Sequence, residues 1–292
     1  MLKRGEMTTQ QIVLLIILIV SFAIILFFIF KLNLGGETAQ DVCHNSVVTR
    51  GTPIVPTDAF PLKCQRQYIC LSTDGTCEAM TKPTIVKVQN KTQVYQALAE
   101  DLANCWWMFG EGKVDYSPST LTPENYCSIC SQIAFDNSVD KIFGAKSFDK
   151  KDFYAYLSTS KRSNGQTYEN YFLINGILSY QGDFGKVDLT KQYYSLIGIT
   201  TKKSTVGWIV GGVVLGGIIG SIPLTGGVSA IAIGTAIGGT VLGGVTGYGA
   251  STLFLSPTIK GPSGNAYVPP SLIQVNSPEF NALNCSMIAT SS

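Results

Sequence analysis

The chain has 292 residues, enough for one or two domains; 14% of them are charged, 45% are hydrophobic and 30 are glycine. This low charge and high glycine content are more typical of a membrane protein than of a soluble enzyme. The net charge of +2, without a basic run or an acidic tail, gives no reason to expect nucleic acid as a partner, and the single histidine argues against most histidine-based catalysis and metal binding.

The first informative stretch is the apolar run 12–30, which has no charge and only Ser21 as a polar residue. As a helix it is about 28 Å long, close to the thickness of the hydrocarbon core of a bilayer. We expect a transmembrane anchor, with residues 1–11 in the cytoplasm because Lys3 and Arg4 precede the run. A cleaved secretory signal is the alternative, disfavoured because the run is long and no small-x-small cleavage site follows.

The motif KRGE at residues 3–6, followed by the apolar run, resembles the class III signal of archaeal type IV pilin-like proteins. The resemblance implies cleavage by a prepilin peptidase after Gly5, with the helix left on the mature protein. Gln10 departs from the pattern, since many pilins have glutamate there, so an uncleaved signal anchor is the alternative. The segments CHNSVV, PLKC and NCWWMFGEG also resemble uncharacterised archaeal membrane proteins, a resemblance that implies no activity.

Residues 31–83 are expected to form a linker and a small cysteine-bearing β module. Within them, residues 66–80 have the pattern of a β-hairpin with a turn at Asp74 and Gly75. Such a hairpin would place Cys70 opposite Cys77, and we therefore expect these two cysteines to form a disulfide.

Residues 84–205 are expected to form the main α+β domain. Apolar residues recur every three or four positions and predict a helix over 92–109, capped by Thr92 and ended by Gly110 and Gly112. The acidic residues Glu100, Asp101 and Glu111 are interpreted as the solvated face and end of this helix. A second helix is predicted over 149–157, and strands are predicted over 167–174, 177–180 and 193–200.

Residues 206–250 are apolar, uncharged and glycine-rich, with a break at 223–227. Glycines four residues apart line one face of a helix and allow close packing, so we expect a transmembrane helical hairpin. The glycines with this spacing are Gly207, Gly211, Gly212, Gly216, Gly220, Gly234, Gly238, Gly239, Gly243 and Gly247. Residues 251–292 would then form an outside C-terminal tail tied to the main domain.

The even number of cysteines indicates a disulfide framework in an oxidising compartment. A hairpin returns the chain to the side it left, so Cys285 can be bridged back to the main domain, and we expect the cysteine-rich part and the C-terminus outside the cell membrane. The sequons at Asn90 and Asn284 fall on the same side and are candidate glycosylation sites. The disulfide candidates are Cys43, Cys64, Cys70, Cys77, Cys105, Cys127, Cys130 and Cys285.

Cys127 and Cys130 form a CxxC motif, which has the clearest chemical potential in the chain. Such a pair can exchange electrons, or supply half of a zinc site together with Cys105 and one further cysteine. A structural role, in which each cysteine pairs elsewhere, is favoured because there is no second CxxC and no thioredoxin-like βαβ pattern. We therefore assign no catalytic, cofactor-binding or metal-binding residue, and expect no cofactor.

These features predict a membrane protein with an N-terminal transmembrane helix, a disulfide-rich α+β ectodomain and a glycine-rich transmembrane hairpin. The function expected is that of a non-enzymatic envelope or surface protein with a structural, assembly or cell-contact role. Its expected partners are the lipid bilayer, other copies of the chain through the hairpin, and an envelope protein. Two alternatives stay open: a pore or oligomer formed by the hairpin, and an envelope thiol–disulfide oxidoreductase that uses the CxxC motif.

Overall fold

The computed structural model describes residues 9–31, 38–52, 61–117, 125–172, 185–200, 259–260, 265–283, 285, 287–288 and 290. The chain divides into two compact units, Met1–Thr38 and Ala39–Ser292. The predicted hairpin over 206–250, its ten glycines, the strand over 177–180 and Asn284 lie outside the described residues.

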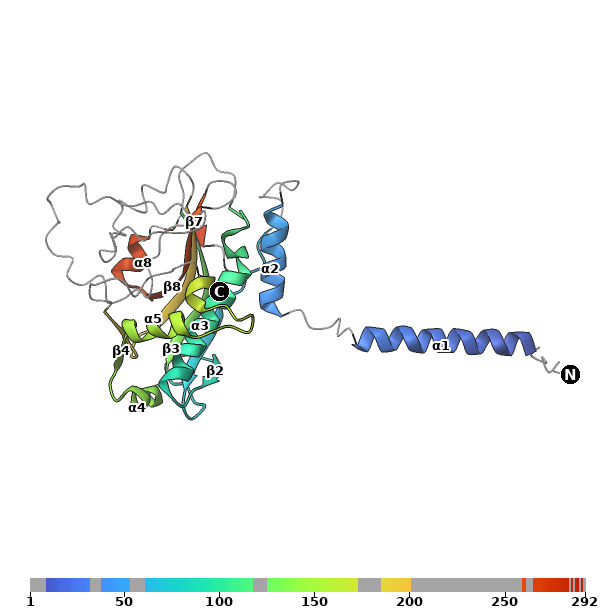
Figure 1. The fold of residues 1–292 in the computed structure, drawn as a ribbon, viewed down its shortest axis with the longest axis horizontal. Helices are drawn as coiled ribbons and strands as arrows, with labels where there is room; N and C mark the ends of the chain where they lie inside the picture. The colour runs from blue at the N-terminus through green and yellow to red at the C-terminus, as the bar shows by residue number, and fades with distance from the viewer. Residues whose placement is uncertain are drawn as a thin grey trace. The chain divides into compact units, whose positions relative to one another are not determined.

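The first unit contains the helix α1 (Thr9–Lys31), which no glycine or proline interrupts (Figure 1). Its large apolar side chains from Ile12 to Phe27 are between 45% and 66% exposed, except that of Leu26, which is half-buried. The one polar side chain between them is satisfied within the helix, because the Ser21 hydroxyl donates to the Ile17 carbonyl oxygen at 2.7 Å.

Within the described part of the chain, no helix has both the length and the apolar character needed to cross a membrane. The predicted fold class, a membrane protein with spanning helices, is therefore contradicted. The structure instead shows a mixed α+β sheet fold with four disulfides. The prediction depended on whole-chain composition and on apolar runs, whereas most apolar residues of the described second unit are buried against a β-sheet.

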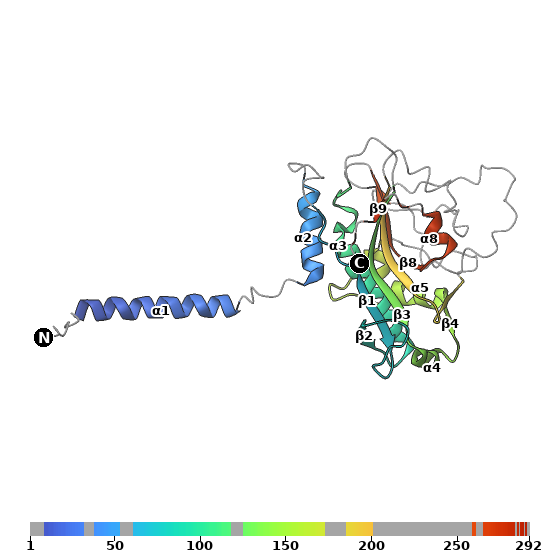
Figure 2. The same cartoon turned by 180° about the vertical axis from the view of Figure 1, so that it is seen from behind.

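The second unit is built on a seven-stranded mixed sheet with the order β2-β1-β3-β6-β8-β7 (Figure 2). The parallel pairs are β1–β2, β1–β3 and β3–β9, and the antiparallel pairs are β3–β6, β6–β8 and β7–β8. The strands are β1 (Gln67–Ser72), β2 (Thr84–Lys87), β3 (Asn125–Phe135), β6 (Tyr193–Thr200), β7 (Ile259–Lys260), β8 (Ala266–Gln274) and β9 (Met287–Ile288). The central strand β3 thus joins segments from both ends of the unit.

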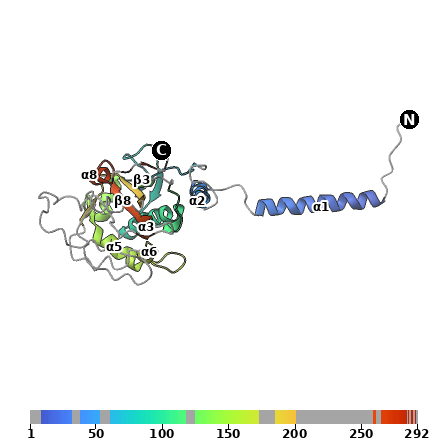
Figure 3. The same cartoon turned by 90° about the horizontal axis from the view of Figure 1, so that it is seen from above.

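Helices cover both faces of this sheet (Figure 3). The helices α3, α5 and α6 lie over one face with the larger apolar cluster, and α8 lies over the other face with a smaller one. The helices are α2 (Ala39–Arg50), α3 (Lys91–Met108), α4 (Asp140–Phe143), α5 (Lys150–Thr159), α6 (Tyr168–Tyr171) and α8 (Pro278–Ala282). Two 3-10 turns span Gly110–Gly112 and Asn137–Val139, and β4 (Ser147–Asp149) pairs with β5 (Lys186–Asp188) in a separate two-stranded sheet.

The helix α3 confirms the predicted helix over 92–109, with a different cap. The Asn90 side chain, rather than that of Thr92, accepts a hydrogen bond from the Gln93 backbone N–H at 3.0 Å. Leu98, on the inner face of α3, is fully buried. Burying a leucine side chain of this kind contributes roughly 1.5–3 kcal/mol of hydrophobic stabilisation. Gly110 follows the helix with a φ of +78°, a conformation that favours glycine at a helix end.

Other predicted elements had mixed outcomes. The helix over 149–157 is confirmed by α5 and the strand over 193–200 by β6. The strand over 167–174 is wrong at residues 168–171, which form α6 because the Thr167 hydroxyl caps the Asn170 N–H and Tyr168 and Tyr171 are buried. The hairpin over 66–80 is also wrong, since β1 pairs in parallel with β2 and β3 and no strand follows at Cys77.

A β-bulge in β3 sets which of its side chains face α3. The register with β6 shifts between Ile129 and Ser131, so Cys130 is the extra residue. Before the bulge, Tyr126 and Cys130 belong to the cluster under α3, whereas Cys127 belongs to the cluster under α8. After the bulge the alternation of side chains between the two faces is shifted by one residue, as the hydrogen bond from Ser131 to Asp101 of α3 shows. Two consecutive residues of β3 therefore face the same helix.

All eight cysteines are paired, which confirms the predicted disulfide framework. The bridge Cys70–Cys77 is the predicted one, although no hairpin supports it, and Cys285 bridges back to the main domain as predicted. The four bridges are Cys43–Cys64, Cys70–Cys77, Cys105–Cys130 and Cys127–Cys285.

The Cys127–Cys285 bridge closes the longest loop, with a sequence separation of 158. Replacing both cysteines by alanine is expected to lower the free energy of unfolding by about 5 kcal/mol, because the unfolded chain regains the freedom of a long loop. Urea unfolding under non-oxidising, non-reducing conditions measures this loss.

Replacing Cys70 and Cys77, which are 7 residues apart, is the matched control, with an expected loss of about 2 kcal/mol. Equal losses for the two double variants would contradict this account.

Candidate functional site

The two cysteines of the CxxC motif are bridged to different partners. Cys127 pairs with Cys285 on the α8 side of the sheet, and Cys130 pairs with Cys105 of α3 on the other side. In an extended strand, Cα atoms three positions apart are about 10 Å from each other, too far for a disulfide. The structural role predicted for these cysteines is therefore the one that the fold supports.

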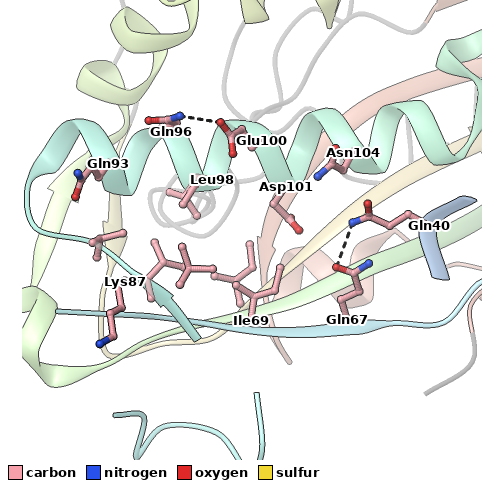
Figure 4. Close-up of a pocket in the computed structure, with 15 residues that line it drawn as sticks. Gln40, Gln67, Ile69, Lys87, Gln93, Gln96, Leu98, Glu100, Asp101 and Asn104 are labelled. Carbon is pink, nitrogen blue, oxygen red and sulfur yellow. Dashed lines mark hydrogen bonds between the residues drawn. The ribbon is translucent and has the colours of Figure 1, made fainter. Parts of the chain in front are cut away.

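A groove runs along α3, between this helix and the strands β1 and β2 (Figure 4). Its volume is about 370 Å³, within the range of small-ligand and side-chain pockets. The floor is apolar and comes from the strands and the inner face of α3: Ile69, Leu71, Val86, Val88, Leu98 and Ile133. The groove therefore offers a water-excluding surface beside an edge strand.

The sides of the groove carry side-chain amides, each of which has both hydrogen-bond donors and acceptors. They are Gln93, Gln96 and Asn104 around α3, Gln67 of β1 and Gln40 of α2. Gln40 donates to Gln67 at 3.4 Å and closes one end of the groove (Figure 4). The sides can therefore bond to a backbone-like ligand without a change of protonation.

Asp101 is the ionisable group at the centre of this groove. Its Oδ2 accepts a hydrogen bond from the Ser131 hydroxyl of β3 at 2.7 Å. Burial raises the pKa of this carboxyl from 3.8 to about 6, and the Ser131 and Ser195 hydroxyls only partly oppose the rise. Asp101 is therefore a carboxylate at neutral pH in a place that disfavours its charge.

The position of Asp101 is fixed by a covalent bond one helical turn away. Asp101 and Cys105 lie on the same face of α3, and their partners Ser131 and Cys130 are the two consecutive residues that the bulge turns toward this helix. The second wall is also tied, because the Cys43–Cys64 bridge holds α2 to the segment that leads into β1. Two disulfides thus hold the helices that form the sides of the groove.

The interpretation of Asp101 as part of a solvated helix face is wrong. Glu100 is exposed as expected and accepts a hydrogen bond from Gln96 at 2.8 Å, and Glu111 pairs with Lys113. Asp101 faces the sheet because Leu98, Leu102 and Cys105 define the buried face and place it at the border of that face. The position of Asp101, three residues after Leu98 and one before Leu102, was the signal in the sequence that its side chain lies at the edge of the buried face.

Two further residues have defined places. Asn90, a glycosylation candidate, is exposed and caps α3, and its modification stays a prediction. The single histidine, His44, stacks on Trp107 at a ring-centroid distance of 4.1 Å, and its Nδ1 lies 2.8 Å from the Trp107 carbonyl oxygen. His44 thus joins α2 to α3 rather than facing the groove's centre.

Comparison with known proteins gives no match: no family model, curated protein or solved structure matches this chain. The resemblance to pilin-like proteins therefore stays a prediction.

Asp101→Asn is expected to stabilise the protein above pH 6 and not below pH 4. A raised carboxyl pKa means that the folded state binds the proton more tightly, so folding is penalised as pH rises from 4 to 6. The penalty, roughly 1–3 kcal/mol, then persists at higher pH, and the neutral asparagine removes it. Urea unfolding at pH 8 and pH 4 measures the difference.

Glu78→Gln, the same change of charge at an exposed position, is the control and should have no pH-dependent effect of this size. An Asp101→Asn variant that is less stable than the parent at both pH values would contradict the account.

Proposed function

We propose that this chain is a non-enzymatic assembly and contact protein that works outside the reducing cytoplasm. In this proposal α1 is the element through which copies associate, and the disulfide-bonded unit is the part displayed to partners. The observation that carries it is the pairing of all eight cysteines within one folded unit.

Complete pairing supports an oxidising compartment, because cytosolic thiols are normally kept reduced. The four bridges are distributed through the fold and join α2, α3, β1 and β3 to other segments. A protein with this many structural bridges and no free cysteine has no thiol for redox exchange. This argues against the oxidoreductase alternative, and the pore alternative depends on residues outside those described.

The surface of α1 supports association between copies. Its three most exposed large apolar residues, Leu14, Ile17 and Leu18, lie at i, i+3 and i+4 and so form one face. An exposed apolar face of this kind is normally covered by another apolar surface. Every further copy of the chain has the same apolar face, so association between copies can cover it, as in symmetric homo-oligomers.

Intact protein, alkylated with and without prior reduction and weighed by mass spectrometry, is expected to show no free thiols before reduction and eight after it. Free thiols at Cys105, Cys127 or Cys130 in protein purified without reductant would contradict the proposal.

Ile17→Glu is expected to raise the dissociation constant of the oligomer tenfold or more. The residue is 64% exposed in the single chain, and covering an isoleucine contributes roughly 1.5–3 kcal/mol, which a buried charge would also oppose. Sedimentation equilibrium of the full chain at several concentrations measures the constant.

Gln11→Glu, which adds the same charge near the start of α1, is the matched control and should associate like the parent. A parent chain that stays monomeric at every concentration, or that binds phospholipid vesicles as a monomer without self-association, would overturn the proposal.

A further inference from the structure

We propose that the groove between α3 and the strands β1 and β2 binds an extended peptide segment of a partner protein, and that a lysine or arginine of this segment pairs with Asp101. This inference goes beyond the assembly role of α1, because it concerns a different part of the chain and a different kind of contact.

The carboxylate decides the charge of the occupant. Asp101 lies at the centre of the groove and accepts a hydrogen bond from Ser131 at 2.7 Å, and its burial disfavours the charge that it carries at neutral pH. Asparagine at this position would keep the hydrogen bond from Ser131 without the charge. An ammonium or guanidinium group of a ligand would offset the cost of burying the negative charge of Asp101 and form a charge-assisted hydrogen bond with it.

The other charges of the groove do not replace such a ligand. Glu100 accepts a hydrogen bond from Gln96 at 2.8 Å and is a second negative charge among the lining residues. Lys87 of β2 is the one cation among the lining residues, and its side chain points away from Asp101 in Figure 4. The region around Asp101 therefore favours a positively charged group over a negative one.

The floor fits the stem of a long basic side chain. Ile69, Leu98 and Ile133 line the groove beside Asp101, and a lysine or arginine stem has three or four methylene groups that bury well on such a surface. The apolar contact and the carboxylate together select for a basic side chain over a small cation, which would leave the floor uncovered.

The amides identify the rest of the occupant as peptide. Gln93, Gln96 and Asn104 follow the length of α3, and Gln40 and Gln67 stand at one end. A row of groups that both donate and accept matches an extended backbone, which presents N–H and C=O groups in alternation. A free amine would use Asp101 and leave this row without partners.

The test is binding of fluorescently labelled peptides to the intact, oxidised chain, measured by fluorescence anisotropy. The peptides have six residues and blocked ends, and differ only at one central position, which is lysine, arginine, norleucine or glutamate. Lysine and arginine peptides are expected to bind about tenfold or more tightly than the norleucine peptide, because a hydrogen bond to a charged group is made only by the basic side chains. The glutamate peptide is expected to bind most weakly.

Four variants make the test specific. Asp101→Asn is expected to remove the preference for lysine over norleucine, whereas Glu78→Gln, with the same change of charge at an exposed site, is expected to keep it. Ala97→Leu fills part of the groove and is expected to weaken binding of every peptide. Ile17→Glu is expected to bind the peptides like the parent chain, so failure of α1 association and failure of the groove can be distinguished.

Equal affinity for the lysine and norleucine peptides would overturn the inference, as would an unchanged preference in Asp101→Asn. Competition by n-butylamine at the affinity of the lysine peptide would overturn the peptide assignment, because it would show that the amide rows take no part.

Discussion

The contact between α3 and β3 is the constraint on which the described second unit depends. One residue of β3, Cys130, is extra to the ladder with β6, and this bulge turns Cys130 and Ser131 to the same side. The helix offers Cys105 and Asp101 one turn apart, so a disulfide and a hydrogen bond form side by side. Without the extra residue, the strand would present only one of these partners to the helix, since side chains alternate between faces. The groove wall, its carboxylate and the cross-link are thus consequences of one irregularity.

Local patterns were enough to predict some of this fold. The helix α3 and the strand β6 follow from periodicity, whereas the Cys70–Cys77 bridge was predicted correctly from a hairpin that does not form. The parallel pairing of β1 with β3 could not be inferred, because it joins residues about sixty positions apart that no short turn connects. The same holds for α6, where a threonine cap and buried tyrosines outweigh β propensity.

The site was harder to predict than the fold, and for a related reason. Asp101 is one position away from core residue Leu102, and sequence alone does not show on which side of that border its carboxyl lies. The partner that decides this is Ser131, whose direction depends on the bulge and therefore on the pairing of β3 with β6. The CxxC motif indicated possible redox or zinc chemistry. Its two cysteines instead join the central strand covalently to segments on opposite faces of the sheet.

The bridge between Cys127 and Cys285 also turns most of the C-terminal half of the chain into a closed covalent ring. A protease that cuts at any single peptide bond between these residues opens the ring without releasing a fragment. The two pieces stay joined by the Cys127–Cys285 bridge, and the cut chain differs from the whole one only by the added water until a reductant separates the pieces. A displayed protein with this connectivity can therefore be nicked by the proteases of its surroundings and still keep its C-terminal strand in the sheet.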